Sequence, residues 1–302
     1  MPQTAQVTVP ATTANIGPGF DCLGAALTLY NRFAFTWAET LSISVTGKEA
    51  DGLSTGPDNL VYESFLALYR AIGQPAPKVH IDIDLHVPLS RGLGSSSTAI
   101  VGGLVGANLL AGSPLNSDQL VTLATKLEGH PDNVVPALLG GCRLAVHGDD
   151  GSLTICEIPW HESIIPVVAI PEFELATADA RRVLPDGYNR ADAIFNTAHL
   201  GLLIRALATG DSQWLKQALC DRIHQPYRKT LIPNYDEIHA TAIANGASGL
   251  VISGAGPTLL ALTTDASAII NTLGYPWKTA QIPYTVQQLA IDTQGTRSQL
   301  MD

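Results

Sequence analysis

The chain has 302 residues, of which 46% are hydrophobic and 15% charged, and its formal net charge at pH 7 is −10. This amount of apolar material suffices for a packed core and excludes an intrinsically disordered chain. The acidic balance, 17 Lys and Arg against 27 Asp and Glu, argues against a nucleic-acid partner, which requires a basic face, and against a role on anionic membranes.

The start of the chain and the cysteines indicate a cellular compartment. The first residues have neither a basic region nor an apolar run, so they do not predict a secretory signal. No apolar run reaches the roughly 18 residues that a bilayer span requires. The four cysteines are widely spaced and form no CxxC pair, which indicates reduced thiols. We therefore expect a cytoplasmic protein.

Strand-like and helical segments alternate along the chain. In the first half, strands are expected at 6–9, 25–38, 79–87, 141–147 and 153–158, and helices at 57–72, 98–110 and 116–128. In the second half, strands are expected at 164–170, 249–253 and 258–263, and helices at 191–209, 212–219 and 235–245. The polar residues 294–302 are expected to be frayed. This mixture predicts an α+β protein with two domains, residues 1–160 and 161–302.

The loop between the expected strand at 79–87 and the expected helix at 98–110 is rich in glycine and serine. Gly92 and Gly94 lack a Cβ atom, so the backbone can take a positive φ and approach an anion closely. The start of the next helix presents unpaired N–H groups to a phosphate. Taken alone, the loop also fits a turn that only caps a core helix. A Walker A lysine, a dinucleotide Gly-x-Gly-x-x-Gly and the His-Arg-Asp loop of protein kinases are absent from the sequence, which indicates a nucleotide site of another class.

Three motifs, in the order of one known family, carry a resemblance. They are residues 9–24, residues 88–98 (Pro-Leu-Ser-Arg-Gly-Leu-Gly-Ser-Ser-Ser-Thr) and residues 253–258 (Ser-Gly-Ala-Gly-Pro-Thr). The second motif resembles the ATP-phosphate loop of the GHMP kinases. The resemblance implies a two-domain kinase, with a ribosomal-S5-like N-terminal domain that binds ATP and a ferredoxin-like C-terminal domain. ATP and the acceptor would then meet in the cleft between them.

Within that family, several segments resemble the homoserine kinases. These segments are Thr-Ala-Asn-x-Gly-x-Gly-Phe-Asp in the first motif, residues 128–134, residues 177–185 and residues 226–233. The resemblance implies ATP-dependent phosphorylation of the side-chain hydroxyl of L-homoserine, a step toward threonine. Two alternatives stay open, a sister GHMP kinase for another small alcohol such as mevalonate, and a catalytically silent ligand-binding homologue. The oligomeric state stays open as well, a homodimer included.

Homoserine is a small zwitterion, so its site needs a cation for the carboxylate and an anion for the ammonium group. Arginine side chains suit the carboxylate because a guanidinium pairs with it bidentately, and Asp21 suits the ammonium group. Singly, each arginine is also compatible with a surface charge and Asp21 with a turn. Gln225 stands where many family members carry Glu, which removes a charge that could orient Arg228. With the resemblance, the predicted substrate-binding residues are Asn15, Asp21, Thr177, Arg181, Arg228 and Gly256.

Glu128 shares a helical face with Val121 and Ala124, and a carboxylate on an apolar face needs a partner. We expect this partner to be Mg²⁺, with Ser96 as the second protein ligand and with phosphate and water oxygens around it. The alternative is that Glu128 lies at a fraying helix end and reaches solvent.

By the resemblance, Asn133 is the residue that contacts the accepting hydroxyl. An amide takes no proton at neutral pH, so we expect Asn133 to orient the hydroxyl, which can suffice for a loose phosphoryl transfer. Asp132 is a weaker candidate for a base, and His130 fits a structural role better than a titrating one. The predicted catalytic residues are Ser96, Glu128, Asp132 and Asn133.

The predicted ATP site combines the phosphate loop with a segment that, by the resemblance, lines the adenine. Arg91 either adds positive potential near ATP or points to solvent. The predicted residues are Asn59, Val61, Pro88, Leu89, Ser90, Arg91, Gly92, Leu93, Gly94, Ser95, Ser96, Ser97 and Thr98.

Overall fold

The computed structural model describes residues 3–301. The strands are β1 (Thr4–Asn15), β2 (Gly19–Trp37), β3 (Ser42–Gly47), β4 (Val79–Leu85), β5 (Cys142–His147), β6 (Leu153–Ile158), β7 (Ile165–Pro171), β8 (Ala247–Ile252), β9 (Leu259–Thr263), β10 (Tyr284–Gln288) and β11 (Arg297–Met301). The helices are α1 (Leu60–Ala71), α2 (Ser95–Leu110), α3 (Ser117–Glu128), α4 (Pro131–Leu139), α5 (Thr177–Arg182), α6 (Arg190–Thr209), α7 (Ser212–Ala218), α8 (Gln225–Arg228), α9 (Tyr235–Ala244), α10 (Ser267–Thr272) and α11 (Tyr275–Thr279). Short 3-10 turns span Ala50–Gly52 and Lys229–Leu231.

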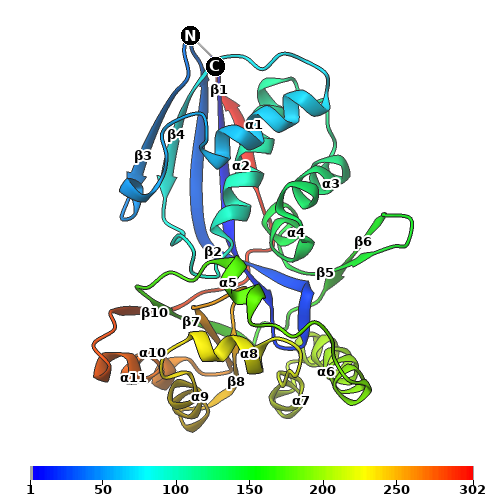
Figure 1. Cartoon of the computed structure of the whole chain (residues 1–302), viewed down its shortest axis with the longest axis vertical. Coiled ribbons are helices and arrows are strands. Elements are labelled where there is room, and N and C mark those ends of the chain that lie inside the picture. The colour runs from blue at the N-terminus through cyan, green and yellow to red at the C-terminus, as the bar shows by residue number, and fades with distance from the viewer. Residues whose placement is uncertain (1–2, 302) are drawn as a thin grey trace.

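The elements form two sheets that follow one another along the long axis of the molecule (Figure 1). The larger sheet has the order β11-β1-β2-β4-β3, with β5 and β6 continuing from β2, and α1–α4 lie beside it. The smaller sheet has the order β10-β7-β9-β8. Helices α5–α9 connect β7 to β8, and α10 and α11 connect β9 to β10. Antiparallel strands in this order are typical of a ferredoxin-like unit, and the α+β class is confirmed.

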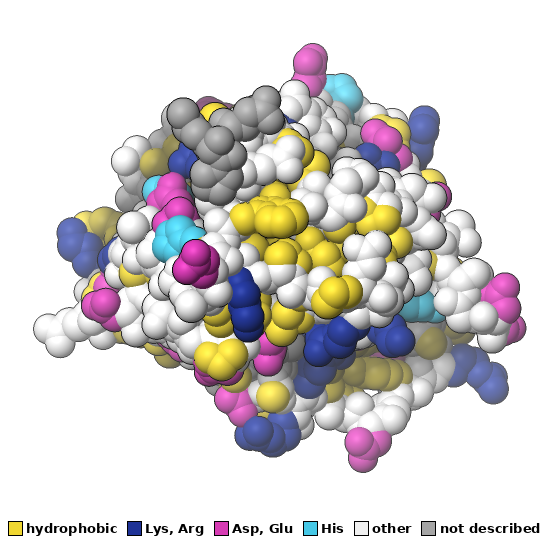
Figure 2. Space-filling model, turned by 90° about the horizontal axis from the view of Figure 1, so that it is seen from above, with side chains coloured by type: hydrophobic (Ala, Val, Ile, Leu, Met, Phe, Trp, Pro, Cys, Tyr) yellow, Lys and Arg dark blue, Asp and Glu magenta, His cyan; other side chains and the backbone are white. Residues whose placement is uncertain are grey.

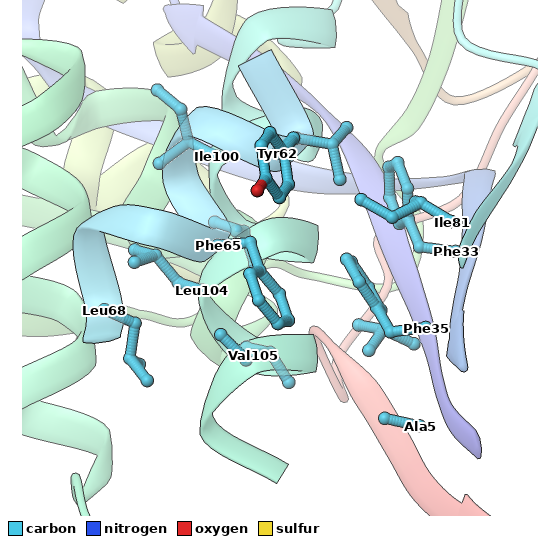
Figure 3. Close-up of a cluster of buried hydrophobic side chains, with 14 of the residues drawn as sticks. Ala5, Phe33, Phe35, Tyr62, Phe65, Leu68, Ile81, Ile100, Leu104 and Val105 are labelled. Carbon is cyan, nitrogen blue, oxygen red and sulfur yellow. The ribbon is translucent and has the colours of Figure 1, made fainter. Parts of the chain in front are cut away.

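The core of the larger unit lies between its sheet and α1 and α2. Figure 3 shows Phe33, Phe35 and Ile81 from the strands pointing toward Phe65 and Leu104 from the helices. These side chains alternate with outward-facing ones along β2 and β4, as a half-buried sheet requires. Phe33 and Phe35 of β2 and the aromatic residues of α1 thereby fill one continuous core.

Helix α2 approaches its neighbours closely because glycines lie on its packed faces. A Cβ atom at Gly103 would stand 2.3 Å from the carbonyl oxygen of Val61 in α1, and one at Gly106 would stand 2.2 Å from the ring of Phe35. Bulkier residues would push α1 and β2 away from α2. These glycines therefore allow α2 to pack closely against both.

The polar tail is not frayed over residues 294–301, so that prediction is wrong there, and Asp302 lies outside the described residues. Arg297–Met301 forms β11, which pairs with β1 from Thr4 to Thr8 in antiparallel register. All five residues of β11 are exposed, so they show no alternation of apolar residues from which a strand could be predicted. The edge of β1 offers backbone N–H and C=O groups that this segment satisfies.

The end view in Figure 2 shows hydrophobic side chains gathered near the middle of that face. Several hydrophobic residues of the larger unit are only partly buried, among them Ile72, Ala111 and Leu115. In residues 3–301, no helix has the length and hydropathy to cross a membrane.

The predicted boundary at residue 160 falls in the connection between β6 and β7, while β11 returns to the larger sheet. The division into 1–160 and 161–302 stays a prediction.

Candidate active site

A cavity of about 400 Å³ is lined by residues of both halves of the chain. The predicted site residues that line it are Asn15, Asp21, Asn59, Val61, Leu89, Ser90, Arg91, Gly92, Gly94, Ser95, Ser96, Glu128, Asp132, Asn133, Thr177, Arg181 and Arg228. The predicted residues that do not line it are Pro88, Leu93, Ser97, Thr98 and Gly256; Gly254 and Ala255 of the third motif line it instead.

The three motifs meet at one wall of this cavity. The Asn15 amide donates to the carbonyl of Gly254 at 2.7 Å, and the backbone N–H of Gly254 donates to the carbonyl of Ala14 at 3.0 Å. The Ser253 hydroxyl donates to the carbonyl of Gly92 at 2.7 Å. The third motif is thus held by hydrogen bonds against the first motif, 239 residues away, and against the second, 161 residues away.

The phosphate loop needs its glycines for steric reasons. Gly92 and Gly94 have φ values of +74° and +70°. A Cβ atom on Gly92 would lie 2.2 Å from the Ser253 carbonyl oxygen, and one on Gly94 would lie 2.0 Å from the Thr12 hydroxyl. Gly94 is also the N-cap of α2 and offers no side chain to its first turn. The open N–H groups and the positive end of the helix dipole there suit a phosphate.

Glu128 lies beside the start of α2 and does not simply reach solvent. Its two carboxylate oxygens accept hydrogen bonds from Ser96 at 3.0 Å and from Ser97 at 2.9 Å. Gly129, with φ +90°, ends α3 directly after Glu128. A serine hydroxyl and a carboxylate are hard oxygen donors, and Mg²⁺ commonly takes only one or two protein ligands beside phosphates and water. The residues present therefore fit this ion.

Two polar residues stand in the first turn of α4. Asp132 is buried and accepts a 2.6 Å hydrogen bond from His130 Nδ1, while Asn133 Oδ1 accepts one of 2.8 Å from the Thr12 hydroxyl. Burial alone would lower the pKa of His130, but the hydrogen bond and charge of Asp132 outweigh it and raise that pKa. His130 thus holds Asp132 in place by this hydrogen bond.

The residues predicted for the two charged ends of the substrate pair with each other. Arg181 donates from both terminal nitrogens to the two carboxylate oxygens of Asp21, each at 2.9 Å. The hydrogen bond from Arg181 to Asp21 raises the pKa of Arg181. The backbone N–H of Asp21, which has φ +55°, donates to Asn15 Oδ1 at 2.9 Å. This part of the cavity therefore presents one negative and one positive group side by side.

Arg228 is oriented by carbonyl oxygens and an aromatic ring. Its Nε donates to Ala180 at 3.1 Å, its Nη1 to Gly254 at 3.0 Å, and its guanidinium lies 5.0 Å from the Phe20 ring centre. Burial lowers the pKa of Arg228. Gln225 instead accepts from the backbone N–H of Ile252 at 2.9 Å, so the missing charge at position 225 does not leave Arg228 unoriented.

Some residues that support the phosphate loop and α2 were not predicted from the sequence. Asn31 is buried and accepts from the backbone N–H groups of His86 and Val87, each at 2.8 Å, while its amide donates to Thr98 in α2 at 2.8 Å. Asn59 uses its amide for the N-cap of α1. No signal in the sequence singles out Asn31. The apolar residues Phe33, Leu53, Leu60, Ile83 and Leu85 also line the cavity.

Comparison with known proteins places these features in context. Residues 59–141 match the model of the GHMP kinases N terminal domain, and residues 203–278 match that of the GHMP kinases C terminal. The chain is 60% identical over 296 residues to a homoserine kinase of Microchaete diplosiphon, and the aligned region covers 97% of this chain and 96% of that protein. It is 59% identical over 293 residues to a homoserine kinase of Trichormus variabilis, and the aligned region covers 96% of this chain and 97% of that protein. The crystal structure of a homoserine kinase from Cytophaga hutchinsonii has a TM-score of 0.88 at 28% identity and covers 98% of this chain and 97% of that chain.

Proposed function

The chain belongs to the GHMP kinases and, among them, to the homoserine kinases, and we propose from this premise that it phosphorylates the side-chain hydroxyl of L-homoserine with ATP. The product is O-phospho-L-homoserine, on the way to threonine. The two-domain GHMP kinase predicted from the motifs is confirmed. The observation that carries the site assignment is a single cavity with a glycine phosphate loop and an Asp–Arg pair in its walls.

The charges in the cavity favour an amino acid as the acceptor. The carboxylate of an α-amino acid can take the place of Asp21 on Arg181, and its ammonium group can take the place of Arg181 on Asp21. A zwitterion therefore satisfies both members of the pair, whereas an acid without an ammonium group, such as mevalonate, leaves Asp21 without a cation. Arg228 supplies a second positive charge nearby. Thr177 lies at the start of α5, the helix that carries Arg181.

In the reaction, the homoserine hydroxyl oxygen forms a bond to the γ-phosphorus, and the bond from this phosphorus to the β–γ bridging oxygen breaks. ADP leaves with the bonding electron pair, and the hydroxyl proton is released. Asn133, held by Thr12, orients the hydroxyl, and the N–H groups at the start of α2 stabilise the charge on the transferred group. Asp132 is the adjacent carboxylate and the candidate proton acceptor. Transfer of the proton to a phosphoryl oxygen is the other route, and Asp132→Asn separates the two because only the first route is blocked.

Ser96 and Glu128 are the residues that would hold Mg²⁺. When bound, the ion neutralises charge on the phosphates of ATP. Ser97 donates to the other oxygen of Glu128 and so keeps the carboxylate turned toward Ser96. We further propose that the enzyme works in the cytoplasm, where its four free cysteines stay reduced, and that no nucleic acid or membrane is among its partners.

The test is ADP release by the purified protein with ATP and Mg²⁺, offered L-homoserine, L-serine, L-threonine or mevalonate in separate reactions. We expect turnover with L-homoserine alone, lost in Glu128→Ala and kept in the control Glu162→Ala, whose side chain is exposed. Turnover with only another alcohol would contradict the acceptor assignment. ATP binding without turnover of any acceptor would support a silent homologue.

A further inference from the structure

Arg91 lies within the phosphate loop, but its guanidinium is engaged by the protein itself. The side chain is 9% exposed. Its Nε donates to the carbonyl of Pro171 at 3.1 Å, Nη1 to that of Leu89 at 2.6 Å and Nη2 to that of Glu172 at 3.3 Å. Nη1 also lies 2.9 Å from a carboxylate oxygen of Glu49. Every nitrogen of the guanidinium thus has a protein partner.

Glu49 bonds both to Arg91 and to the loop backbone. Its second carboxylate oxygen accepts from the N–H of Leu89 at 2.7 Å. Glu49 therefore accepts a hydrogen bond from the Leu89 N–H, and Arg91 donates one to the Leu89 carbonyl. Glu49 directly precedes the 3-10 turn Ala50–Gly52, and Gly52 and Leu53 line the cavity with Leu89. These hydrogen bonds connect two segments of the cavity wall, the one after Glu49 and the phosphate loop.

Arg91 also reaches the other half of the chain. Pro171 ends β7, and Glu172 follows it on the way to α5, the helix that carries Arg181. The same connection donates from the N–H of Leu175 to the carbonyl of Ser90 at 3.0 Å. Ser90, a non-glycine residue with φ +53°, and Gly92, with φ +74°, flank Arg91. For a non-glycine residue such as Ser90 this backbone region is unfavourable, and it persists only where the surroundings hold it.

We propose that Arg91 is a positioning residue, which holds the phosphate loop against Glu49 and against the connection from β7 to α5, and is not a ligand of the ATP phosphates. The inference rests on the proposed function. A guanidinium neutralised by Glu49 and bonded to three carbonyls contributes little positive potential to a nucleotide, since its charge is already compensated. Its contribution is the shape of the loop and its place relative to Arg181.

The experiment measures ADP binding by calorimetry and the KM values for ATP and L-homoserine in Arg91→Ala, Arg91→Lys, Glu49→Gln and the double variant Arg91→Ala/Glu49→Gln. If Arg91 positions the loop, Glu49→Gln weakens nucleotide binding in the same direction as Arg91→Ala, by about ten- to a hundredfold, as for other supporting residues around ligand sites. Arg91→Lys resembles Arg91→Ala, because a lysine lacks the fork. The double variant is little worse than the more damaging single one, because both remove one interaction.

A phosphate ligand would behave in the opposite way. Glu49→Gln would then free the charge of Arg91 and strengthen ADP binding, and Arg91→Lys would keep near-normal affinity as a point charge; either result overturns the proposal. Arg32→Ala, an exposed arginine on β2, is the matched control. Thermal melting checks each variant, and if Arg91→Ala does not fold, the lysine and glutamine variants carry the test. A folded wild-type protein that binds no ADP would contradict the proposed function instead.

Discussion

At the scale of single residues, part of the backbone strain lies beside the cavity. Of the non-glycine residues of the described chain with positive φ, Asn15, Ile16, Asp21 and Ser90 lie in the first two motifs, while Ser113, Asn234 and Gln281 lie elsewhere. Each is held by bonds to another segment or by burial, as Asn15 is by Gly254 and Ser90 by Leu175. Strained residues that persist in this way often position functional groups. Here they place the Asp21 carboxylate opposite Arg181.

Replacing Asp21 by Ala tests the acceptor end of the cavity. We expect the KM for L-homoserine to rise by about ten- to a hundredfold, since a hydrogen bond to a charged group contributes about 1.5–3 kcal/mol, while the KM for ATP stays unchanged. Steady-state kinetics with each substrate varied measures both. Asp179→Ala, in the exposed pair with Arg182, is the control. An equal loss for both substrates would contradict the assignment.

His224 adds a pH dependence to stability. It is fully buried, its Nε2–H donates to the carbonyl of Gly17 at 2.7 Å, and within the described residues its Nδ1 has no hydrogen-bond partner. Burial lowers the pKa of His224 below 6.5, with Arg228 adding to this and Asp221 opposing it. The unfolded chain therefore binds a proton that the folded chain does not bind as the pH falls below about 6.5.

Stability should consequently decrease as the pH falls below about 6.5, by up to about 1.4 kcal/mol for each pH unit. His130, whose pKa is raised, acts with the opposite sign, so the test is a difference between variants. Urea unfolding at pH 5.5 and 7.5 should show a smaller pH effect for His224→Gln than for the wild type. His147→Gln, at an exposed position, should leave the effect unchanged. The same slope in His224→Gln and the wild type would refute this account.

At the scale of elements, α2 determines how the phosphate loop meets the core. Its first turn borders the cavity, and its glycines lie against α1 and β2. α1 begins at Leu60, next to Asn59 and Val61 in the cavity wall. The separation of α1 and α2 therefore sets the width of the apolar end of the cavity, where an adenine ring would lie.

Gly103→Ala should destabilise the protein by about 1–3 kcal/mol, because the new Cβ atom would meet the backbone of α1 and overpacking costs more than the helix propensity of Ala returns. We also expect a higher KM for ATP. The control is Gly201→Ala in α6, where a Cβ atom meets nothing within 4 Å and stability should rise by about 0.5–1 kcal/mol. Urea denaturation measures both, and an unchanged or higher stability of Gly103→Ala would disprove the packing argument.

At the scale of the whole molecule, the returning tail connects β1 and β11 to α4, the helix that carries Asp132 and Asn133. Asp292 is buried and accepts hydrogen bonds from the Tyr30 hydroxyl, from Arg297 and from the backbone N–H groups of Gln294 and Gly295, at 2.7–2.9 Å. Thr296, which follows Gly295, donates from its hydroxyl to the carbonyl of Ala137 and from its N–H to that of Leu138, both at the end of α4. The tail thus braces the helix whose first turn holds Asp132 and Asn133.

Asp292→Ala should lower stability by about 2–3 kcal/mol, since it leaves several buried or partly buried donors without an acceptor. Loosening of α4 should also lower kcat more than it raises the KM for ATP. Chemical denaturation and steady-state kinetics measure these effects. Gln299→Ala, at an exposed position of β11, should change neither. Wild-type stability of Asp292→Ala would show that the tail does not brace α4.

Much of the fold and part of the candidate site followed from the sequence. The alternation in β4, the apolar face of α3, and the strand–loop–helix order around Gly92 are local patterns, and local patterns are readable without a structure. β11 was misjudged because an exposed edge strand has no apolar period. Asn31 and Glu49 were missed because a single polar residue distant in sequence from the loop carries no local signal.

The sequence by itself determined the family, the three motifs and the residue types available for a phosphate, a metal ion and a zwitterion, because these reside in short segments with their own chemistry. Only the tertiary structure decided how those residues are used. It paired Asp21 with Arg181, turned Ser97 toward Glu128, bonded Gln225 to Ile252 and not to Arg228, and bonded Arg91 to Glu49 and to the carbonyls of Pro171 and Glu172. Each of these contacts joins residues at least 27 positions apart, and such partners are determined by packing of the whole chain and not by local propensity.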